Sequence, residues 1–321
     1  MYSNMKFGVT LPTWDYGAPN GGNLEGGQPV NYKEIVDVAL ISEKLGYYSI
    51  LVDDHLMRGK GGYIYEGWTT LSAISSITGK IRLGTIVLCN SFRRPSVLAK
   101  MISTLDVISE GRVELGIGAG WMEEEYVQYG IPFPNSKIRI GQLEEGVEIM
   151  KKLWTEDMAS YKGKYYTIKD VVCEPKPIQK PHPPIWIGGG GEQLTLRVVA
   201  KLADGCNFGG SLEVYKHKLE VLKKHCLKVG RDFGEVKKSW IGNLAISLDK
   251  DYLKKKIEMI KPRNISFEDY AKSNIVGTPV QCMDKIRKYL ELGITYFIFN
   301  GFSRLTQEEL EFFSKEVMPN L

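Results

Sequence analysis

The chain has 321 residues, of which 43% are hydrophobic and 25% are charged, so it can bury a large core and is not a disordered protein. No stretch approaches the 18 consecutive apolar residues of a membrane span, and Met1–Lys6 lacks the basic and apolar regions of a signal peptide. Five scattered cysteines without a Cys-x-x-Cys pair and four dispersed histidines argue against a disulfide framework and a metal site. We therefore expect a cytoplasmic protein with reduced thiols.

The net charge is +4, from 42 basic and 38 acidic residues. The two signs are interspersed along the sequence, which argues against a nucleic-acid surface. A small anionic ligand remains compatible with this balance.

Short β-rich runs alternate with longer helical patterns along the whole chain, which is typical of a parallel sheet with crossover helices. The expected strands are residues 5–11, 49–53, 81–88, 112–118, 185–187, 206–208, part of 239–248, and 295–299. The expected helices are residues 31–46, 68–78, 96–109, 137–154, 192–203 and 212–229, and two more that begin with capping boxes at Thr278 and Thr306. Eight such units predict a closed (β/α)8 TIM barrel, and an open doubly wound sheet is the lesser alternative.

We interpret residues 1–321 as one barrel domain with insertions at the C-terminal ends of the strands. Residues 15–30 and 57–66 are glycine-rich loops. Residues 155–183 combine aromatic side chains with a proline run and are interpreted as an insertion that acts as a lid. Residues 249–276 form a charged, poorly patterned insertion.

Asp54 and His55 close the second predicted strand, where a TIM barrel carries its active site. A histidine there can exchange protons near neutral pH, and a neighbouring carboxylate can orient it. The alternative is a surface histidine without a role.

Two glycine-rich turns follow predicted strands. Gly188–Gly191 precedes a helix, so its backbone N–H groups could bind a phosphate; a tight turn is the alternative, but four consecutive glycines exceed what a turn needs. Gly116–Trp121 could make room for a flat ring walled by Trp121, or its glycines could relieve packing inside the barrel.

Two charged runs have weaker functional interpretations. Glu123–Glu125 suits the first turn of a helix, and one of the three could be a catalytic acid. Arg93 and Arg94 could hold an anionic substrate but more simply form a solvated face.

Six stretches together resemble the bacterial luciferase-like superfamily, and within it the branch that uses the deazaflavin coenzyme F420. Each stretch is loose alone, but their order and spacing are specific. They are Val52–Leu56, Leu105–Arg112, Leu115–Trp121, Pro183–Gly190, Ala203–Gly205 and Gly277–Pro279.

The resemblance implies a flavin-like ring lying across the strand ends and a hydride passed to or from its C5 atom. By matching position, Asp54 and His55 flank the ring, and His55 is the general acid or base. The Ile86–Val87 bond matches a non-proline cis peptide that buttresses the ring. The remaining cofactor-binding residues are Ala119, Gly120 and Trp121 along the ring and ribityl chain, and Gly189, Gly190, Gly191 and Thr195 at the phosphate.

The same resemblance leaves substrate and coenzyme open. Deazaflavin-dependent sugar-phosphate dehydrogenases have a glutamate where this chain has Trp121, which predicts a different small-molecule substrate. The Gly-Ala-Gly-Trp form also occurs in FMN-dependent monooxygenases, which receive reduced flavin from a partner reductase. A non-catalytic relative is a third alternative. Members are commonly homodimers or homotetramers, and we expect the same here.

Overall fold

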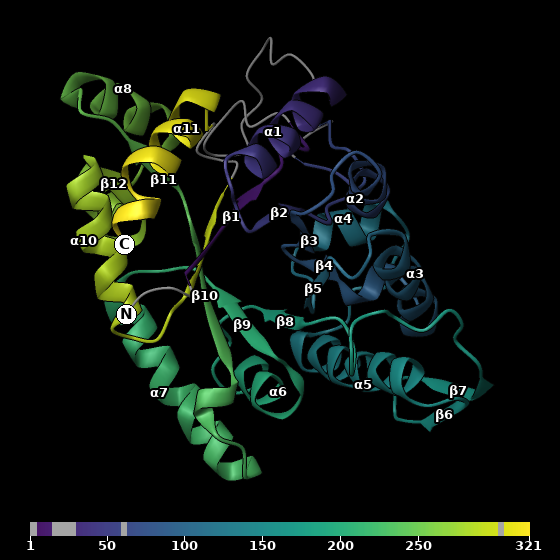
Figure 1. Cartoon of the computed structure of the whole chain (residues 1–321). Coiled ribbons are helices and arrows are strands. Elements are labelled where there is room, and N and C mark those ends of the chain that lie inside the picture. The colour runs from purple at the N-terminus through teal and green to yellow at the C-terminus, as the bar shows by residue number, and fades with distance from the viewer. Residues whose placement is uncertain (1–4, 15–29, 59–62, 301–304) are drawn as a thin grey trace.

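Eight parallel strands form a closed barrel in the computed structural model, which describes residues 5–14, 30–58, 63–300 and 305–321 (Figure 1). Each strand pairs with the next around the ring, and the pairing of the third with the fourth closes it. This confirms the predicted (β/α)8 barrel and excludes the open sheet. In order around the ring the strands are β1 (Lys6–Thr10), β2 (Ser49–Val52), β3 (Arg82–Thr85), β5 (Val113–Gly118), β8 (Ile185–Gly188), β9 (Gly205–Phe208), β10 (Lys237–Gly242) and β13 (Tyr296–Phe299).

Helices surround the barrel, and several begin where the sequence predicts. Asn31 accepts a hydrogen bond from the Lys33 N–H, and Thr278 and Thr306 each form a complete capping box. The helices are α1 (Tyr32–Lys44), α2 (Gly67–Ser75), α3 (Pro95–Ile108), α4 (Glu123–Gln128), α5 (Ser136–Thr155), α6 (Thr195–Leu202), α7 (Leu212–Val229), α8 (Lys250–Ile260), α9 (Phe267–Ser273), α10 (Pro279–Leu290) and α11 (Gln307–Glu316). In the described part of the chain, no helix combines the length and apolarity that crossing a membrane requires.

The hydrophobic core has two layers, as a parallel barrel requires. The larger layer lies between the strands and the surrounding helices. A smaller cluster of Leu51, Trp186, Tyr296 and Ile298 comes from strands that are not neighbours, so it fills the barrel interior. The Trp186 and Tyr296 rings lie 5.3 Å apart between centroids.

The prediction of one continuous strand over residues 81–88 is wrong. The segment divides into β3 and the short β4 (Leu88–Cys89), separated by a cis peptide bond between Ile86 and Val87. The resemblance implied this cis bond, but β-propensity alone gave no sign of the break.

The interpretation of residues 249–276 as poorly patterned is also wrong. The segment contains α8 and α9, and Leu253, Ile257 and Ile260 of α8 keep helical spacing and are buried. The helices are flanked by β11 (Leu244–Ile246) and β12 (Ile275–Gly277), which pair in parallel.

Residues 155–183 include an antiparallel hairpin of β6 (Ala159–Lys162) and β7 (Thr167–Val171). Glu145 on α5 accepts hydrogen bonds from the N–H groups of Lys164, Tyr165 and Tyr166 at the hairpin tip, at 2.7–3.0 Å. In this structure the hairpin therefore packs on α5 in the helical layer (Figure 1).

Candidate active site

A cavity of about 140 Å³ lies at the C-terminal end of the barrel, beside the ends of β2 and β5. This is the end where TIM barrels carry their catalytic groups. Six of the predicted site residues line it, and no residue of 155–183 does. The lining residues are Asp53, Asp54, His55, Ile86, Val87, Leu88, Cys89, Phe92, Gly120, Trp121, Met122, Glu125 and Tyr126.

His55 is held by Glu125, the third residue of α4. The Glu125 Oε2 atom lies 3.2 Å from His55 Nδ1. The other oxygen, Oε1, accepts hydrogen bonds from the N–H groups of Leu56 and Met57. Glu123–Glu125 does begin a helix, as predicted, but Glu125 is only 2% exposed and contacts the histidine directly.

Asp54, which the sequence suggested as a neighbour able to orient His55, has another partner. Its carboxylate accepts two hydrogen bonds from the Arg93 guanidinium, at 2.8 and 2.9 Å, and one from the Cys89 N–H at 2.8 Å. Arg93 also pairs with Glu66. The interpretation of Arg93 as a solvated or substrate-binding residue is therefore wrong, because its side chain is 12% exposed and is paired with Asp54 and Glu66.

The side chain of Val87 occupies space left by three glycines. A Cβ atom would lie 2.8 Å from both Val87 methyl groups at Gly188 and 3.0 Å from one at Gly118. At Gly116 it would meet the Thr85 carbonyl oxygen first and then a Val87 methyl group at 3.1 Å. Contacts this close would force the neighbours apart. Of the two sequence interpretations of Gly116–Trp121, relief of packing therefore applies to Gly116 and Gly118.

Gly120 is required for a different reason. Its φ of +77° is the left-handed conformation that favours glycine, and a Cβ there would collide with the Tyr126 hydroxyl. Tyr126 in turn accepts or donates a 2.8 Å hydrogen bond with the Cys89 thiol. Burial raises the pKa of Cys89 to about 11, so the thiol at the cavity wall is protonated at neutral pH. Ala119, predicted beside it, is not among the lining residues.

Trp121 forms the exposed edge of the site. It is 66% exposed, and its ring meets the His55 ring edge-on at 5.9 Å. The Arg58 guanidinium lies over the rings of both Trp121 and Trp14, at 5.9 and 4.6 Å. Trp121 therefore lines the cavity beside His55, and Arg58 links its ring to that of Trp14.

Asp53 is a second carboxylate beside His55 that sequence analysis did not select. Trp14 Nε1 donates a 3.2 Å hydrogen bond to it. Burial raises the pKa of Asp53, and the charges of His55 and Arg58 and the Trp14 hydrogen bond oppose that shift. Its position directly before Asp54 was the available signal.

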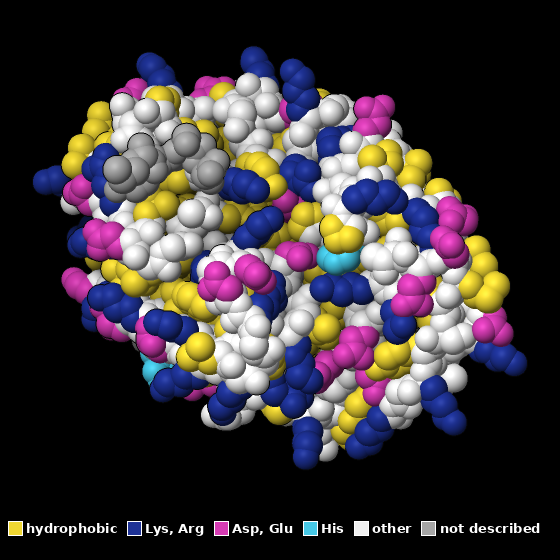
Figure 2. Space-filling model, turned by 60° about the horizontal axis from the view of Figure 1, so that its bottom comes forward, with side chains coloured by type: hydrophobic (Ala, Val, Ile, Leu, Met, Phe, Trp, Pro, Cys, Tyr) yellow, Lys and Arg dark blue, Asp and Glu magenta, His cyan; other side chains and the backbone are white. Residues whose placement is uncertain are grey.

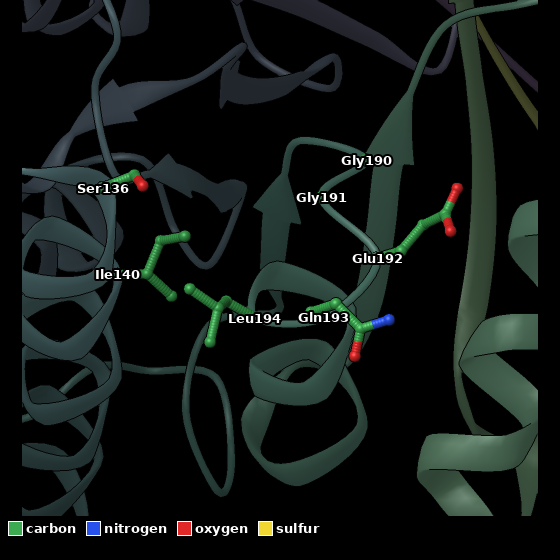
Figure 3. Close-up of a pocket in the computed structure, with 7 residues that line it drawn as sticks. All are labelled: Ser136, Ile140, Gly190, Gly191, Glu192, Gln193 and Leu194. Atoms are coloured by element: carbon green, nitrogen blue, oxygen red, sulfur yellow. The ribbon is translucent and has the colours of Figure 1, made fainter.

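A second hollow of about 480 Å³ contains the predicted phosphate-binding glycines (Figure 3). Ser136 and Ile140 of α5 face the loop that joins β8 to α6, and the Glu192 side chain points away from them. Glu192 instead lies 3.1 Å from His217 Nε2. The lining residues are Ser136, Ile140, Gly190, Gly191, Glu192, Gln193 and Leu194.

The remaining two predicted phosphate residues lie next to this hollow. Gly189 has a φ of +111°, and its N–H donates to the Asn207 carbonyl at 2.9 Å. Thr195 begins α6 and is 8% exposed, and a Cβ at Gly191 would approach its Oγ1 atom to 2.8 Å.

A hydrogen bond from α5 reaches a residue that lines the His55 cavity. Arg139 stands on α5 between Ser136 and Ile140, and its Nε donates a 3.3 Å hydrogen bond to the Gly120 carbonyl. The N-terminal turns of α5 therefore connect the His55 cavity with the glycine loop.

The described residues contain no group of three or more His, Cys, Asp or Glu side chains arranged to hold a metal ion. On the face that Figure 2 shows, Lys and Arg side chains alternate with Asp and Glu. That face therefore carries no patch of a single charge.

Residues 5–261 match the family model described as luciferase-like monooxygenase. The chain belongs to this family. The match covers most of the barrel and confirms the resemblance predicted from the sequence motifs.

Relatives with curated functions match nearly the whole chain. An F420-dependent glucose-6-phosphate dehydrogenase from Segniliparus rotundus is 29% identical, over 91% of this chain and 94% of its own length. The enzyme of the same name from Microbacterium testaceum is 30% identical, over 90% and 93%.

Among solved structures, the F420-dependent tetrahydromethanopterin reductase from Methanopyrus kandleri superposes with a TM-score of 0.80, covering 99% of both chains at 19% identity. At that identity the likeness speaks for the fold.

Proposed function

We propose that this protein is an F420-dependent oxidoreductase that transfers a hydride between the coenzyme and a small organic substrate, with His55 as the general acid or base. The observation that carries the proposal is that His55 and the cis Ile86–Val87 segment line one cavity at the catalytic end of the barrel. The curated relatives support the choice of coenzyme, because they are F420-dependent enzymes.

The residues present fit such a coenzyme. The cavity of about 140 Å³ is smaller than a whole cofactor site, so it suits the reacting part of the ring, with the apolar Ile86 and Val87 on one side. Helix α5, which hydrogen-bonds to Gly120 through Arg139, also borders the glycine loop, where the backbone N–H groups of Gly190 and Gly191 and the start of α6 favour a phosphate. The side chain of Glu192, the one acidic residue of that loop, points away from Ser136 and Ile140 and lies beside His217.

When bound, the deazaflavin supplies a C5 atom that donates or accepts the hydride. An alcohol that loses a hydride from carbon must also lose its hydroxyl proton to become a carbonyl compound, and the His55 imidazole takes that proton. In the reverse direction the imidazolium returns it. Ile86 and Val87 make one side of the site apolar, and a less polar surrounding strengthens the charge interactions of His55.

The substrate we infer is a small alcohol, aldehyde, imine or pterin-type compound. Trp121 borders His55 with an exposed apolar ring where sugar-phosphate dehydrogenases carry a glutamate. Glucose 6-phosphate, on which the curated relatives act, is therefore a required comparison in any substrate screen. Turnover of that sugar phosphate at a rate matching the best small alcohol would contradict this part of the proposal.

The proposal extends to the oligomeric state and the cellular compartment of the protein. We expect a homodimer or homotetramer, which light scattering tests directly. The five cysteines are buried and free, which supports a reducing, cytoplasmic setting.

Fluorescence titration of the purified protein with F420 and, in parallel, with FMN tests the proposal. Micromolar or tighter binding of F420, with much weaker binding of FMN, is the expected result. Preference for FMN would overturn the proposal in favour of an oxygen-using monooxygenase with a partner reductase.

A further inference from the structure

The carboxylate of Glu125 has two separate tasks in the site. Oε1 accepts hydrogen bonds from the backbone N–H groups of Leu56 and Met57, so it fixes the chain directly after His55. Oε2 lies 3.2 Å from His55 Nδ1. Because Oε1 is committed to two backbone donors, Glu125 cannot rotate to exchange the two oxygens without breaking those bonds.

The protonation state of Glu125 decides what His55 Nδ1 must carry. Burial would raise the pKa of Glu125, but the hydrogen bonds from His55 and from the N–H groups of Leu56 and Met57 lower it below the usual 4.5. Glu125 is therefore ionised at neutral pH and can only accept a hydrogen bond.

We propose that Glu125 is a positioning residue that fixes neutral His55 in the tautomer protonated at Nδ1 and so leaves the Nε2 lone pair free for the substrate. In a neutral imidazole one nitrogen carries the proton and the other accepts, so a proton held at Nδ1 by a carboxylate leaves Nε2 as the base. This inference rests on the proposed function for its role in catalysis, but not for the tautomer itself.

The other groups around the ring are compatible with this assignment. Among the described residues, no hydrogen-bond partner lies at Nε2, and Trp121 meets the ring at 86°, edge to face. The charge of His55 opposes the rise in the pKa of Asp53, and no hydrogen bond joins Asp53 to Nδ1 between described residues.

Glu125→Gln is the informative substitution because it changes only the group that faces Nδ1. The amide oxygen of glutamine can continue to accept from Leu56 and Met57, which directs the amide NH₂ toward Nδ1. A donor there requires an accepting Nδ1, so the proton must move to Nε2. Glu124→Gln is the matched control, because Glu124 lies on the same helix, is exposed and bonds to Gln128.

The tautomer can be read by ¹⁵N NMR of the histidine side chains without coenzyme or substrate. The chain has four histidines, so a His55→Gln spectrum assigns the signal of His55. We expect the Nδ1–H tautomer in the wild-type protein and in Glu124→Gln, and the Nε2–H tautomer in Glu125→Gln. The inference would be overturned if His55 of the wild-type protein carried its proton at Nε2. It would also be overturned if the His55 signals of Glu125→Gln matched those of the wild-type protein.

Kinetics separate a positioning role from a purely structural one. For the enzyme with bound F420 we expect Glu125→Gln to lower kcat about 10–100-fold with little change in the Kd for F420. Loss of a hydrogen bond that orients a functional histidine typically lowers activity by that factor. Glu125→Asp retains a carboxylate and should keep the Nδ1–H tautomer and recover part of kcat. Should Glu125→Gln fail to fold, the wild-type and Glu125→Asp tautomers still decide the question.

Failure of this inference is distinguishable from failure of the proposed function. If the protein ignores F420, the proposed function fails while the tautomer measurement keeps its meaning. If F420 binds but His55 carries its proton at Nε2, the role of Glu125 fails alone.

Discussion

The two hollows at the C-terminal end of the barrel are built in different ways. Around His55, side chains hold one another through long-range pairs, His55 with Glu125 and Asp54 with Arg93. At the second hollow the lining comes from one short loop segment, Gly190–Leu194, with Ser136 and Ile140 opposite.

This difference separates chemistry from binding. Paired, buried side chains can fix the position and protonation of a reacting group, whereas backbone N–H groups at a helix start supply a constant, positively polarised surface for an anion. Changes around His55 should therefore act on turnover and stability, and changes at the loop should act on coenzyme affinity.

Replacement of His55 should have the largest effect. His55→Ala removes the group that exchanges the substrate proton, and we expect kcat to fall by about 10²–10⁴ while the Kd for F420 stays within a few-fold. Steady-state kinetics and fluorescence titration measure the two quantities. His217→Ala, which removes an exposed histidine near the other hollow, is the control and should leave kcat unchanged. Undiminished turnover in His55→Ala would contradict the assignment of the chemistry to the His55 cavity.

Breaking the second pair should affect stability. Asp54→Asn leaves the Arg93 guanidinium, 12% exposed, without its bidentate partner, and removal of one member of a buried pair typically costs about 3–5 kcal/mol. Glu66 remains beside Arg93, so the lower end of that range is expected in urea unfolding. Glu66→Gln, at a carboxylate that is 37% exposed, should cost clearly less. Equal losses in the two variants would show that burial of Asp54 does not matter.

The packing of Val87 can be tested by a substitution at Gly188, the last residue of β8. In Gly188→Ala the new methyl group would lie 2.8 Å from both Val87 methyl groups, and overpacking of this kind costs about 1–3 kcal/mol. The displaced Val87 should also weaken F420 binding. Gly79→Ala, whose Cβ would meet nothing within 4 Å, is the matched control for added side-chain volume. If Gly188→Ala kept the stability and the F420 affinity of the wild-type protein, Val87 would not be part of the surface that binds the ring.

A change at the loop should have the smallest effect and a different signature. Thr195→Val removes one hydroxyl beside Gly191, and loss of a hydrogen bond to a charged phosphate is worth about 1.5 kcal/mol, or roughly tenfold in Kd. Turnover at saturating F420 should be unchanged. A fall in kcat with an unaltered Kd for F420 would contradict the account, because it would give Thr195 a role in the chemistry and not in coenzyme binding.

The barrel and the position of His55 were predictable from local patterns. Alternating strands and helices fix which residues end each strand, and the ends of parallel strands share one edge, so His55 and Gly190 could be assigned to that edge.

The partners of those residues were not predictable. Glu125 lies 70 positions from His55 in sequence and Arg93 lies 39 from Asp54, and no local pattern reports which charges meet across such distances. For the same reason Gly116 was interpreted as possible room for a ring, although it packs against the Thr85 carbonyl at the end of β3 and against Val87, which lies between β3 and β4.

A crystal structure of the protein with F420 tests the central claim most directly. We expect the deazaflavin ring between His55 and the Ile86–Val87 segment, with its C5 edge toward His55 and the phosphate at Gly190, Gly191 and Thr195. A ring bound elsewhere, or one that turns its C5 edge away from His55, would contradict the proposed function.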